Sequence, residues 1–355
     1  MSAFYSDRGL TAPASEESPE TIRECRDTLR RLHTAGTPWR LIGQGQHVRH
    51  AAWTASPPEE AVAIRTTAMN RVIEINRASG ILRVEAGITY GELIDVAREE
   101  GFSLQRYGLH PASATVGGLL CRFRPGPPEL RAGDLLDGCV GLGAHDPDAD
   151  DYRYLVAPRK ASGPDLRYHF LGREGRHGAL LDVALVLWKP QAQRLLIFDD
   201  LPLADTSSLM TRLFRAGIRP GFVHYSLASS TLQLGLVGPG QLLHSRAKWI
   251  ETVFPEPAET LVGDDVSRRK AWLQARHPDR RTQPQAAATR VAWFTPAALQ
   301  EDPETLLGPV ADVEIPSWTS QRIEAFLRYD PADLLAARAH TFPPGTTWAA
   351  WWQRP

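Results

Sequence analysis

Residues 70–89, which read NRVIEINRASGILRVEAGIT, decide the fold class of this chain. Two apolar runs, at 72–75 and 81–84, flank a turn that ends at Gly80. Strand-forming residues on both sides of such a turn predict a β-hairpin. The second strand is expected to end at Gly87, because glycine lets the backbone turn sharply.

A helix is expected directly after this hairpin. Thr89 and Glu92 have the spacing of a capping box, in which each side chain binds the backbone N–H of the other residue. Gly101 is placed to end the helix. The order strand, strand, helix predicts an α+β domain.

The residues before the hairpin predict a helix, a short strand and a glycine turn. Residues 1–17 are small and polar, and we expect them to be flexible. Ser18 is the expected cap of a helix that ends at Gly36. Residues 38–42 then form a predicted strand that runs into GQGQH at residues 43–47. Glycines in such a turn let the backbone approach a ligand closely.

A second glycine-bearing loop follows the capped helix, with the sequence PASATVGG at residues 111–118. A later apolar run at residues 179–188 predicts a buried strand, after which Pro190 closes the first domain. We therefore expect one domain at residues 18–190 and a second at residues 191–355.

This order of motifs resembles the PCMH-type FAD-binding domain of the vanillyl-alcohol oxidase and para-cresol methylhydroxylase superfamily, especially its glycolate oxidase subunit and D-lactate dehydrogenase-like branches. Residues 70–89 are similar to the family's LNRVLEID and VEAGVT strings. RLIGQGQH at residues 40–47 resembles the loop around the FAD pyrophosphate. ATVGG at residues 114–118 resembles the loop beneath the isoalloxazine ring. KASGPDL at residues 160–166 and GREGRHG at residues 172–178 are weaker likenesses.

The resemblance implies an α+β fold with a two-subdomain PCMH-type FAD-binding domain, followed by a smaller α+β cap domain. It implies FAD as the cofactor, and backbone N–H groups of glycine turns can bind its pyrophosphate without a cationic side chain. The cofactor-binding residues that it implies are Gly43, Gln44, Gly45, Gln46, His47, Pro111, Ala114, Thr115, Gly117, Gly118, Asp165, Gly175 and Gly178.

Some positions in the first loop depart from the family's pattern. Gln44 and Gln46 stand where the family favours glycine and a hydroxyl residue. His47 lies one position beyond the histidine that some relatives attach to FAD, so we expect a non-covalent cofactor. Val48 occupies the place of the third glycine of a Rossmann motif, and no Gly-Lys-Ser/Thr of a P-loop follows. NAD and ATP are therefore not the expected ligands.

The resemblance also implies that the second half of the chain covers the flavin and supplies the base that takes a proton from the substrate. His224 is the candidate base, and Tyr225 or Arg219 is the candidate group that orients a substrate carboxylate. The alternative is that His224 and Tyr225 are only a packed or surface pair within a strand. Helices are expected near residues 205–216 and 320–338.

Three tryptophans near the end of the chain, Trp348, Trp351 and Trp352, are spaced for one apolar face in a helical or irregular segment. We expect this face to dock the tail onto the body of the protein. Left exposed, it would instead form an interface with a partner.

Composition limits the partners and the compartment. The net charge of -1 gives no general attraction to nucleic acid or acidic membranes. Three cysteines, an odd number without metal-binding spacing, argue against a disulfide framework and a metal site and indicate the cytoplasm. No segment approaches the ~20 apolar residues of a membrane span, and the N-terminus lacks the pattern of a signal peptide.

Two functions remain open from the sequence. The first is an FAD-dependent oxidoreductase that oxidises a small hydroxy acid or alcohol by hydride transfer to the flavin. The second is a non-catalytic flavin-fold subunit or scaffold with weak or lost FAD binding, which works with a partner subunit. The absorption spectrum of the purified protein separates them, because only bound flavin gives the protein a yellow colour.

Overall fold

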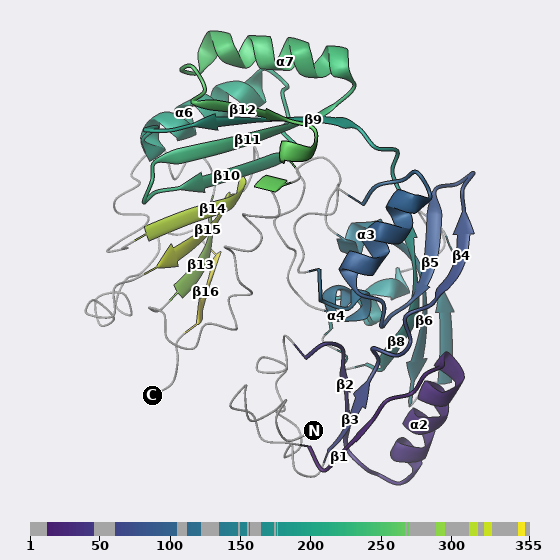
Figure 1. Cartoon of the computed structure of the whole chain (residues 1–355). Helices are drawn as coiled ribbons and strands as arrows, with labels where there is room; N and C mark the ends of the chain where they lie inside the picture. The colour runs from purple at the N-terminus through teal and green to yellow at the C-terminus, as the bar shows by residue number, and fades with distance from the viewer. Residues whose placement is uncertain are drawn as a thin grey trace. The chain divides into compact units, whose positions relative to one another are not determined.

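The computed structural model divides the chain into two compact units, with the boundary between Pro190 and Gln191 (Figure 1). Unit 1 contains the described residues up to Pro190, and unit 2 contains those from Gln191 onward. The structure describes residues 13–45, 61–104, 112–121, 135–147, 150–154, 156, 165–173, 175, 177–266, 268–269, 289–294, 312–318, 323–328 and 347–351.

Unit 1 begins with a small parallel sheet and one helix. The strands are β1 (Ser15–Glu17), β2 (Trp39–Ile42) and β3 (Val62–Arg65), in the order β1-β3-β2. Helix α2 (Ile22–Thr34) buries Cys25, Leu29 and Leu32, which lie at helical spacing, in one core with Val62 and Ile64 of β3. This apolar face holds the helix on the sheet.

The start of α2 differs from the expected one. Thr21, not Ser18, caps the helix, because its hydroxyl oxygen accepts the backbone N–H of Glu24 at 3.1 Å. Gly36 follows the helix with a φ of +63°, as the sequence predicts. Part of the segment expected to be flexible is ordered, since residues 15–17 form β1.

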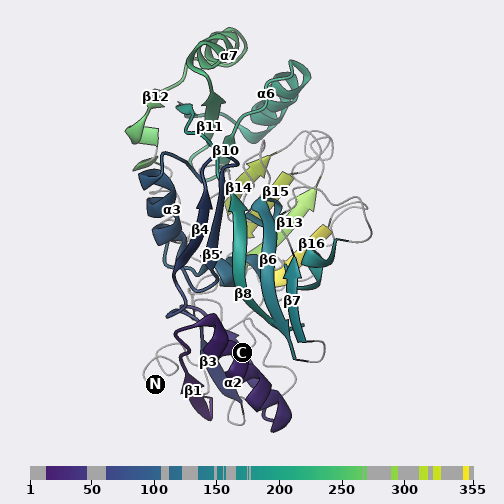
Figure 2. The same cartoon turned by 90° about the vertical axis from the view of Figure 1, so that its right-hand side faces the viewer.

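The second part of unit 1 is an antiparallel sheet with the strand order β4-β5-β8-β6-β7 (Figure 2). Short helices pack with one face of it around a core that includes Leu82, Val84, Leu93 and Leu120. The strands are β4 (Val72–Asn76), β5 (Ile81–Glu85), β6 (Cys139–Asp146), β7 (Asp150–Tyr154) and β8 (Ala179–Val186), and the helices are α3 (Tyr90–Glu99), α4 (Val116–Leu120), α5 (Leu135–Gly138) and η2 (Leu166–His169).

The hairpin and the capping box that the sequence predicts are both present. Strands β4 and β5 pair around Gly80, which has a φ of +62°. The Thr89 N–H donates to Glu92 Oε2 at 2.8 Å, and the Glu92 N–H donates to Thr89 Oγ1 at 3.2 Å. Gly101, with a φ of +73°, follows α3.

Unit 2 is an antiparallel sheet with two helices over one of its faces (Figures 1 and 2). The strand order is β12-β9-β11-β10-β14-β15-β13-β16. Met210 and Leu213 of the first helix and Ile250 of the second share a core with Leu196 and Val223 of the sheet. The elements are β9 (Ala192–Phe198), α6 (Leu203–Arg215), β10 (Phe222–Ser226), β11 (Thr231–Gly238), α7 (Gly240–Val253), β12 (Glu259–Val262), β13 (Thr289–Phe294), β14 (Asp312–Trp318), β15 (Ile323–Arg328) and β16 (Thr347–Trp351).

Two expectations for unit 2 are wrong. Residues 323–328, expected within a helix, form β15, which pairs with β13 and β14 on its two sides. Residues 347–351, which carry two of the three tryptophans, form strand β16 beside β13. In both cases pairing with distant strands decides the structure, which local periodicity does not report. No helix among the described residues is long and apolar enough to cross a membrane.

Candidate cofactor site

The two glycine-bearing loops of unit 1 come into direct contact. Gly43 is the first residue after strand β2, and Thr115 is the residue before helix α4. A side-chain carbon added to Gly43 would lie 2.2 Å from Thr115 Oγ1 and 2.9 Å from Thr115 Cγ2. Only glycine therefore lets the first loop lie this close to the second.

The second loop also runs along the end of the hairpin. The Gly117 N–H donates to the Ala86 carbonyl at 2.7 Å, and the Val116 N–H donates to the Ile88 carbonyl at 2.8 Å. A side-chain carbon on Gly117 would lie 2.9 Å from the Ala86 carbonyl oxygen. This loop is therefore fixed by backbone contacts on one side and touches Gly43 on the other.

Helix α4 links the loop to a third segment. Thr115 Oγ1 caps the helix by accepting the Gly118 N–H at 3.3 Å. The Leu120 carbonyl accepts the Gly172 N–H at 2.9 Å, which joins the segment of the weaker family likeness to the same helix. Three distant stretches of sequence thus meet around α4.

The first loop is also held by an ion pair that the sequence analysis missed. Arg65, the last residue of β3, donates from Nη1 to the Gly43 carbonyl at 3.1 Å. The same guanidinium binds both carboxylate oxygens of Glu16 in β1, at 2.5 and 3.0 Å. Nothing in the spacing of residues 16, 43 and 65 predicts this contact, since it depends on the parallel pairing of three strands.

These loops fit an extended ligand that carries phosphate groups. At Gly43, Gly117 and Gly118 an added side-chain carbon would lie within 3.0 Å of a neighbouring atom, so the close packing around the two loops requires glycine at these positions. Gly45 has a φ of +72°, a conformation that favours glycine. Backbone N–H groups of such turns suit a pyrophosphate. Those of Val116, Gly117 and Gly118 are bound within the protein, so the candidate donors lie in the first loop.

The remaining predicted cofactor residues divide into four groups. Gln44 and Ala114 lie in the two touching loops, whereas Gln46, His47 and Pro111 lie outside the described residues. Asp165 accepts the Arg167 N–H and pairs with its guanidinium, so its carboxylate has a local structural role.

Gly175 and Gly178 are required by the conformation of their own segment. Gly175 has a φ of +75°. Gly178 has a φ of +131°, and a side-chain carbon there would lie 2.2 Å from the His145 carbonyl oxygen. Contact of these glycines with the cofactor remains a prediction.

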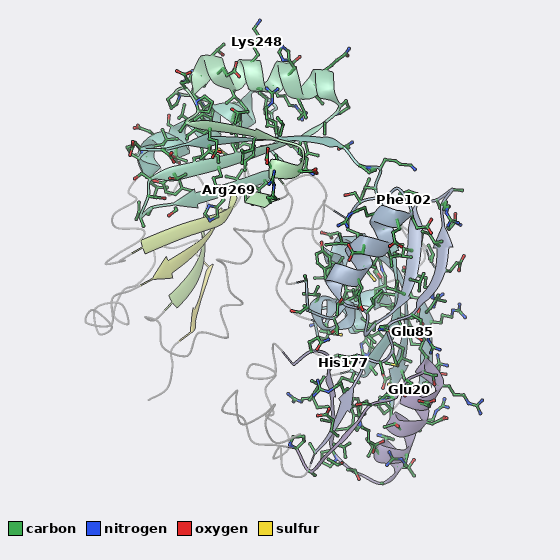
Figure 3. All side chains as sticks on the ribbon, in the orientation of Figure 1. Glu20, Glu85, Phe102, His177, Lys248 and Arg269 are labelled. Carbon is green, nitrogen blue, oxygen red and sulfur yellow. The ribbon has the colours of Figure 1, made fainter. Side chains whose placement is uncertain are left out.

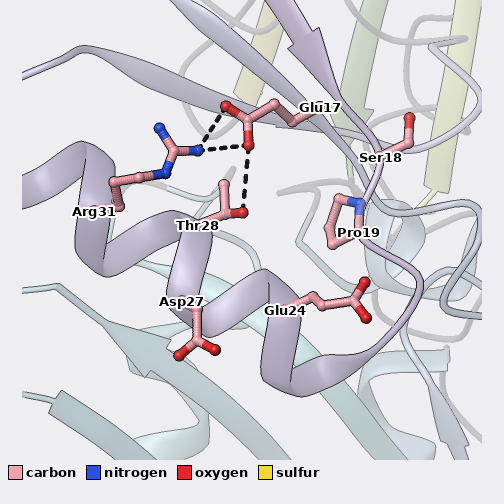
Figure 4. A pocket seen from close by; sticks show the side chains of 7 residues that line it. All are labelled: Glu17, Ser18, Pro19, Glu24, Asp27, Thr28 and Arg31. Atoms are coloured by element: carbon pink, nitrogen blue, oxygen red, sulfur yellow. Dashed lines mark hydrogen bonds and ion pairs between the residues drawn. The ribbon is translucent and has the colours of Figure 1, made fainter.

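A hollow of about 530 Å3 lies elsewhere in unit 1, beside α2 (Figure 4). The Glu17 carboxylate in it accepts two bonds from Arg31 and one from Thr28, at 2.7, 2.6 and 3.4 Å. Its lining contains none of the predicted cofactor residues. The residues around it are Glu17, Ser18, Pro19, Glu24, Asp27, Thr28 and Arg31.

The two predicted catalytic residues of unit 2 lie on opposite faces of its sheet. Tyr225 is fully buried in the core under α6 and α7, and its hydroxyl donates to the Leu201 carbonyl at 3.1 Å. Burial raises the pKa of this phenol, and a hydrogen bond with Ser230 opposes the rise. Because neighbouring residues of a strand point to opposite faces, Tyr225 cannot orient a ligand beside His224. The idea that it orients the substrate is therefore corrected.

His224 shares its face with two polar residues that the sequence analysis missed. Gln233 is the direct cross-strand partner of His224, and both side chains are buried. Arg269 donates from Nε to Gln233 Oε1 at 3.2 Å. Figure 3 shows Arg269 on the side of the sheet away from α7, whose outer surface carries Lys248. A glutamine inside the apolar strand TLQLGLVG was the available sequence signal.

Fold and site together define unit 1 as an α+β domain built to hold a phosphate-bearing cofactor. Residues 13–150 match the family described as FAD binding domain. Residues 13–150 therefore form an FAD-binding domain, and its cofactor is FAD.

Curated relatives agree with this assignment. An uncharacterised FAD-linked oxidoreductase of Escherichia coli is 28% identical over 131 residues, which are 37% of this chain and 27% of that protein. The mitochondrial D-2-hydroxyglutarate dehydrogenase of Rattus norvegicus is 28% identical over 178 residues, 50% of this chain and 31% of that protein. An uncharacterised FAD-linked oxidoreductase of Mycobacterium tuberculosis is 26% identical over 258 residues, 68% of this chain and 54% of that protein. The chain thus spans between about a quarter and about half of the length of these relatives.

A solved structure shares the fold. The structure of an alkyldihydroxyacetonephosphate synthase superposes with a TM-score of 0.73 at 15% identity, covering 91% of this chain and 69% of that one. At this identity the likeness concerns the fold alone.

Proposed function

We propose that this protein is an FAD-dependent oxidoreductase that oxidises a small hydroxy acid by hydride transfer to the flavin. The observation that carries the proposal is the contact between Gly43 and Thr115, which joins the two glycine loops of the FAD-binding domain. When bound, FAD supplies the acceptor for the hydride. The chain itself must then bind the substrate and accept the hydroxyl proton.

The polar face of the unit 2 sheet supports a hydroxy acid as the substrate. His224 offers an imidazole nitrogen that can accept a hydroxyl proton. Arg269 offers a guanidinium, which binds carboxylates in a planar, two-pronged geometry. Gln233 accepts a hydrogen bond from Arg269 and is the strand partner of His224, so His224 and Gln233 lie on one face with Arg269 bound to Gln233. A small molecule with a hydroxyl and a carboxylate matches His224 and Arg269, respectively.

The proposal is tested by following the bleaching of the bound flavin without oxygen. A panel of 2-hydroxy acids and matched alcohols without a carboxylate is added to the purified protein. We expect some of the acids to reduce the flavin, and His224→Gln to slow that reduction by about 100-fold or more. Arg269→Gln is expected to weaken the binding of the hydroxy acids and not that of the alcohols. His244→Gln, an exposed histidine on α7, is the matched control and keeps the wild-type rate.

The non-catalytic alternative gives a different result in the same experiment. A flavin-fold subunit that serves a partner would hold FAD without reduction by any hydroxy acid, or would fail to take up FAD at all. Flavin that stays oxidised with every acid in the panel would therefore reject the oxidoreductase proposal for the isolated chain.

A further inference from the structure

Arg65 connects the three strands of the small parallel sheet to the first FAD loop. It is the last residue of the central strand β3, and its side chain and that of Glu16 are each 17% exposed. The guanidinium binds Glu16 of β1 through Nε and Nη2. It binds the carbonyl of Gly43, just after β2, through Nη1. One planar group thus joins both outer strands across the central one.

This contact fixes the orientation of one peptide group in the loop. The Gly43 carbonyl and the Gln44 N–H belong to the same planar peptide, and in a trans peptide they point in opposite directions. No cis peptide occurs among the described residues. When Arg65 draws the Gly43 carbonyl toward itself, the Gln44 N–H is turned away from Arg65. We propose that Arg65, held by Glu16, is a positioning residue that sets this peptide of the first loop for binding of FAD.

The charge arrangement indicates a tether and not a direct phosphate ligand. Both carboxylate oxygens of Glu16 lie on the guanidinium, so the positive charge of Arg65 is matched locally by a negative one. A neutral pair adds little attraction for a distant phosphate. The GQGQ string has glycine at positions 43 and 45, and glycine gives the backbone conformational freedom. An external anchor such as Arg65 limits that freedom.

The test measures FAD affinity by fluorescence titration of the apoprotein, so it does not depend on substrate or turnover. We expect Arg65→Met to raise the Kd for FAD about tenfold, because a charged hydrogen bond to the loop is lost. Arg65→Lys should weaken FAD binding to a similar extent, since one ammonium group cannot reproduce the three hydrogen bonds of the planar guanidinium. The salt dependence of the Kd should stay that of the wild type, because no phosphate ligand has been removed.

The matched control is a second largely buried arginine pair of unit 1, Arg83 and Asp182. Their side chains are 14% and 8% exposed, and Arg83 Nε lies 2.7 Å from Asp182 Oδ1. Arg83→Met should lower thermal stability as Arg65→Met does but keep the Kd within about twofold of the wild type. An equal loss of FAD affinity in Arg65→Met and Arg83→Met would show that Arg65 has a purely structural role and would overturn the inference.

Two further outcomes decide the matter. Full recovery of wild-type affinity in Arg65→Lys, or a weaker salt dependence in Arg65→Met, would mean that Arg65 acts by its charge and would overturn the tether. If Arg65→Met does not fold, Glu16→Gln decides: the tether predicts about a threefold rise in Kd, and an unchanged Kd contradicts it. The inference rests on the FAD site and not on the proposed substrate, so unreduced flavin leaves it standing.

Discussion

Gly43 and Thr115 lie against each other so closely that no side-chain carbon fits on Gly43 without coming within 2.2 Å of the Thr115 hydroxyl oxygen. The first residue belongs to the loop after β2, and the second caps helix α4. Two loops that are far apart in sequence therefore meet through Gly43 and the Thr115 side chain. We expect FAD binding by unit 1 to depend on this contact.

The contact predicts a specific loss in Gly43→Ala. The added methyl group collides with Thr115 and separates the loops, so we expect FAD affinity to fall about tenfold or more, as for other overpacked sites. Gly240→Ala is the control, because nothing lies within 4 Å of the added carbon there. FAD titration measures both variants.

A double variant sharpens this test. Thr115→Ala removes the two atoms nearest to the added methyl group, and we expect it to restore part of the affinity that Gly43→Ala loses. Additive losses in Gly43→Ala/Thr115→Ala would show that the two positions act independently.

Gly117 offers a prediction about stability. In Gly117→Ala the new carbon lies 2.9 Å from both the carbonyl oxygen and the Cβ of Ala86. Backbone cannot move away as a flexible side chain can, so we expect the free energy of unfolding to fall by about 1 to 3 kcal/mol. Urea unfolding followed by circular dichroism measures the change. A variant as stable as the wild type would contradict the backbone packing described for this loop.

Tyr225 and His224 are predicted to behave differently on substitution. Tyr225→Phe removes the bond to the Leu201 carbonyl, which should cost about 1 kcal/mol of stability. The rate of flavin reduction should not change, because the phenol lies in the core away from His224. A large drop in this rate without loss of stability would restore Tyr225 as a candidate substrate residue.

The buried thiols predict a pH effect. Burial raises the pKa of Cys25 from 9.0 to about 12, and that of Cys139 likewise. In the folded protein at pH 9 only about one such thiol in a thousand is ionised, so iodoacetamide should react slowly until urea unfolds the chain. The unfolded chain ionises first, so this contribution to stability is full below about pH 9 and is lost as the pH rises toward 12. Equal alkylation rates in the folded and unfolded protein at pH 9 would contradict the burial.

Local signals in the sequence predict the elements that local chemistry determines. The hairpin around Gly80 and the capping box of Thr89 and Glu92 need only neighbouring residues, and both are present. The cap of α2 shows the limit, since Ser18 and Thr21 are both suitable caps and the hydrogen bond to Glu24 selects Thr21.

Long-range pairing accounts for what the sequence did not predict. Residues 323–328 form a strand because two other strands flank them, not because of their own pattern. The same holds for the site: the Arg65 contact with Gly43 arises only when three parallel strands align. Gln233 lies beside His224 because of strand register, and Arg269 reaches Gln233 from a distant segment. The spacing of these residues in the sequence therefore does not predict their contact.

The most direct test of the central claim is the FAD content of the purified full chain, measured after acid precipitation. The two-loop site predicts one FAD per chain, and much less FAD in Gly43→Ala purified in the same way. Because we expect a non-covalent cofactor, all of this FAD should be released into the supernatant. A chain that remains colourless in excess FAD, or a Gly43→Ala variant that keeps its full complement, would contradict the claim that these loops hold the cofactor.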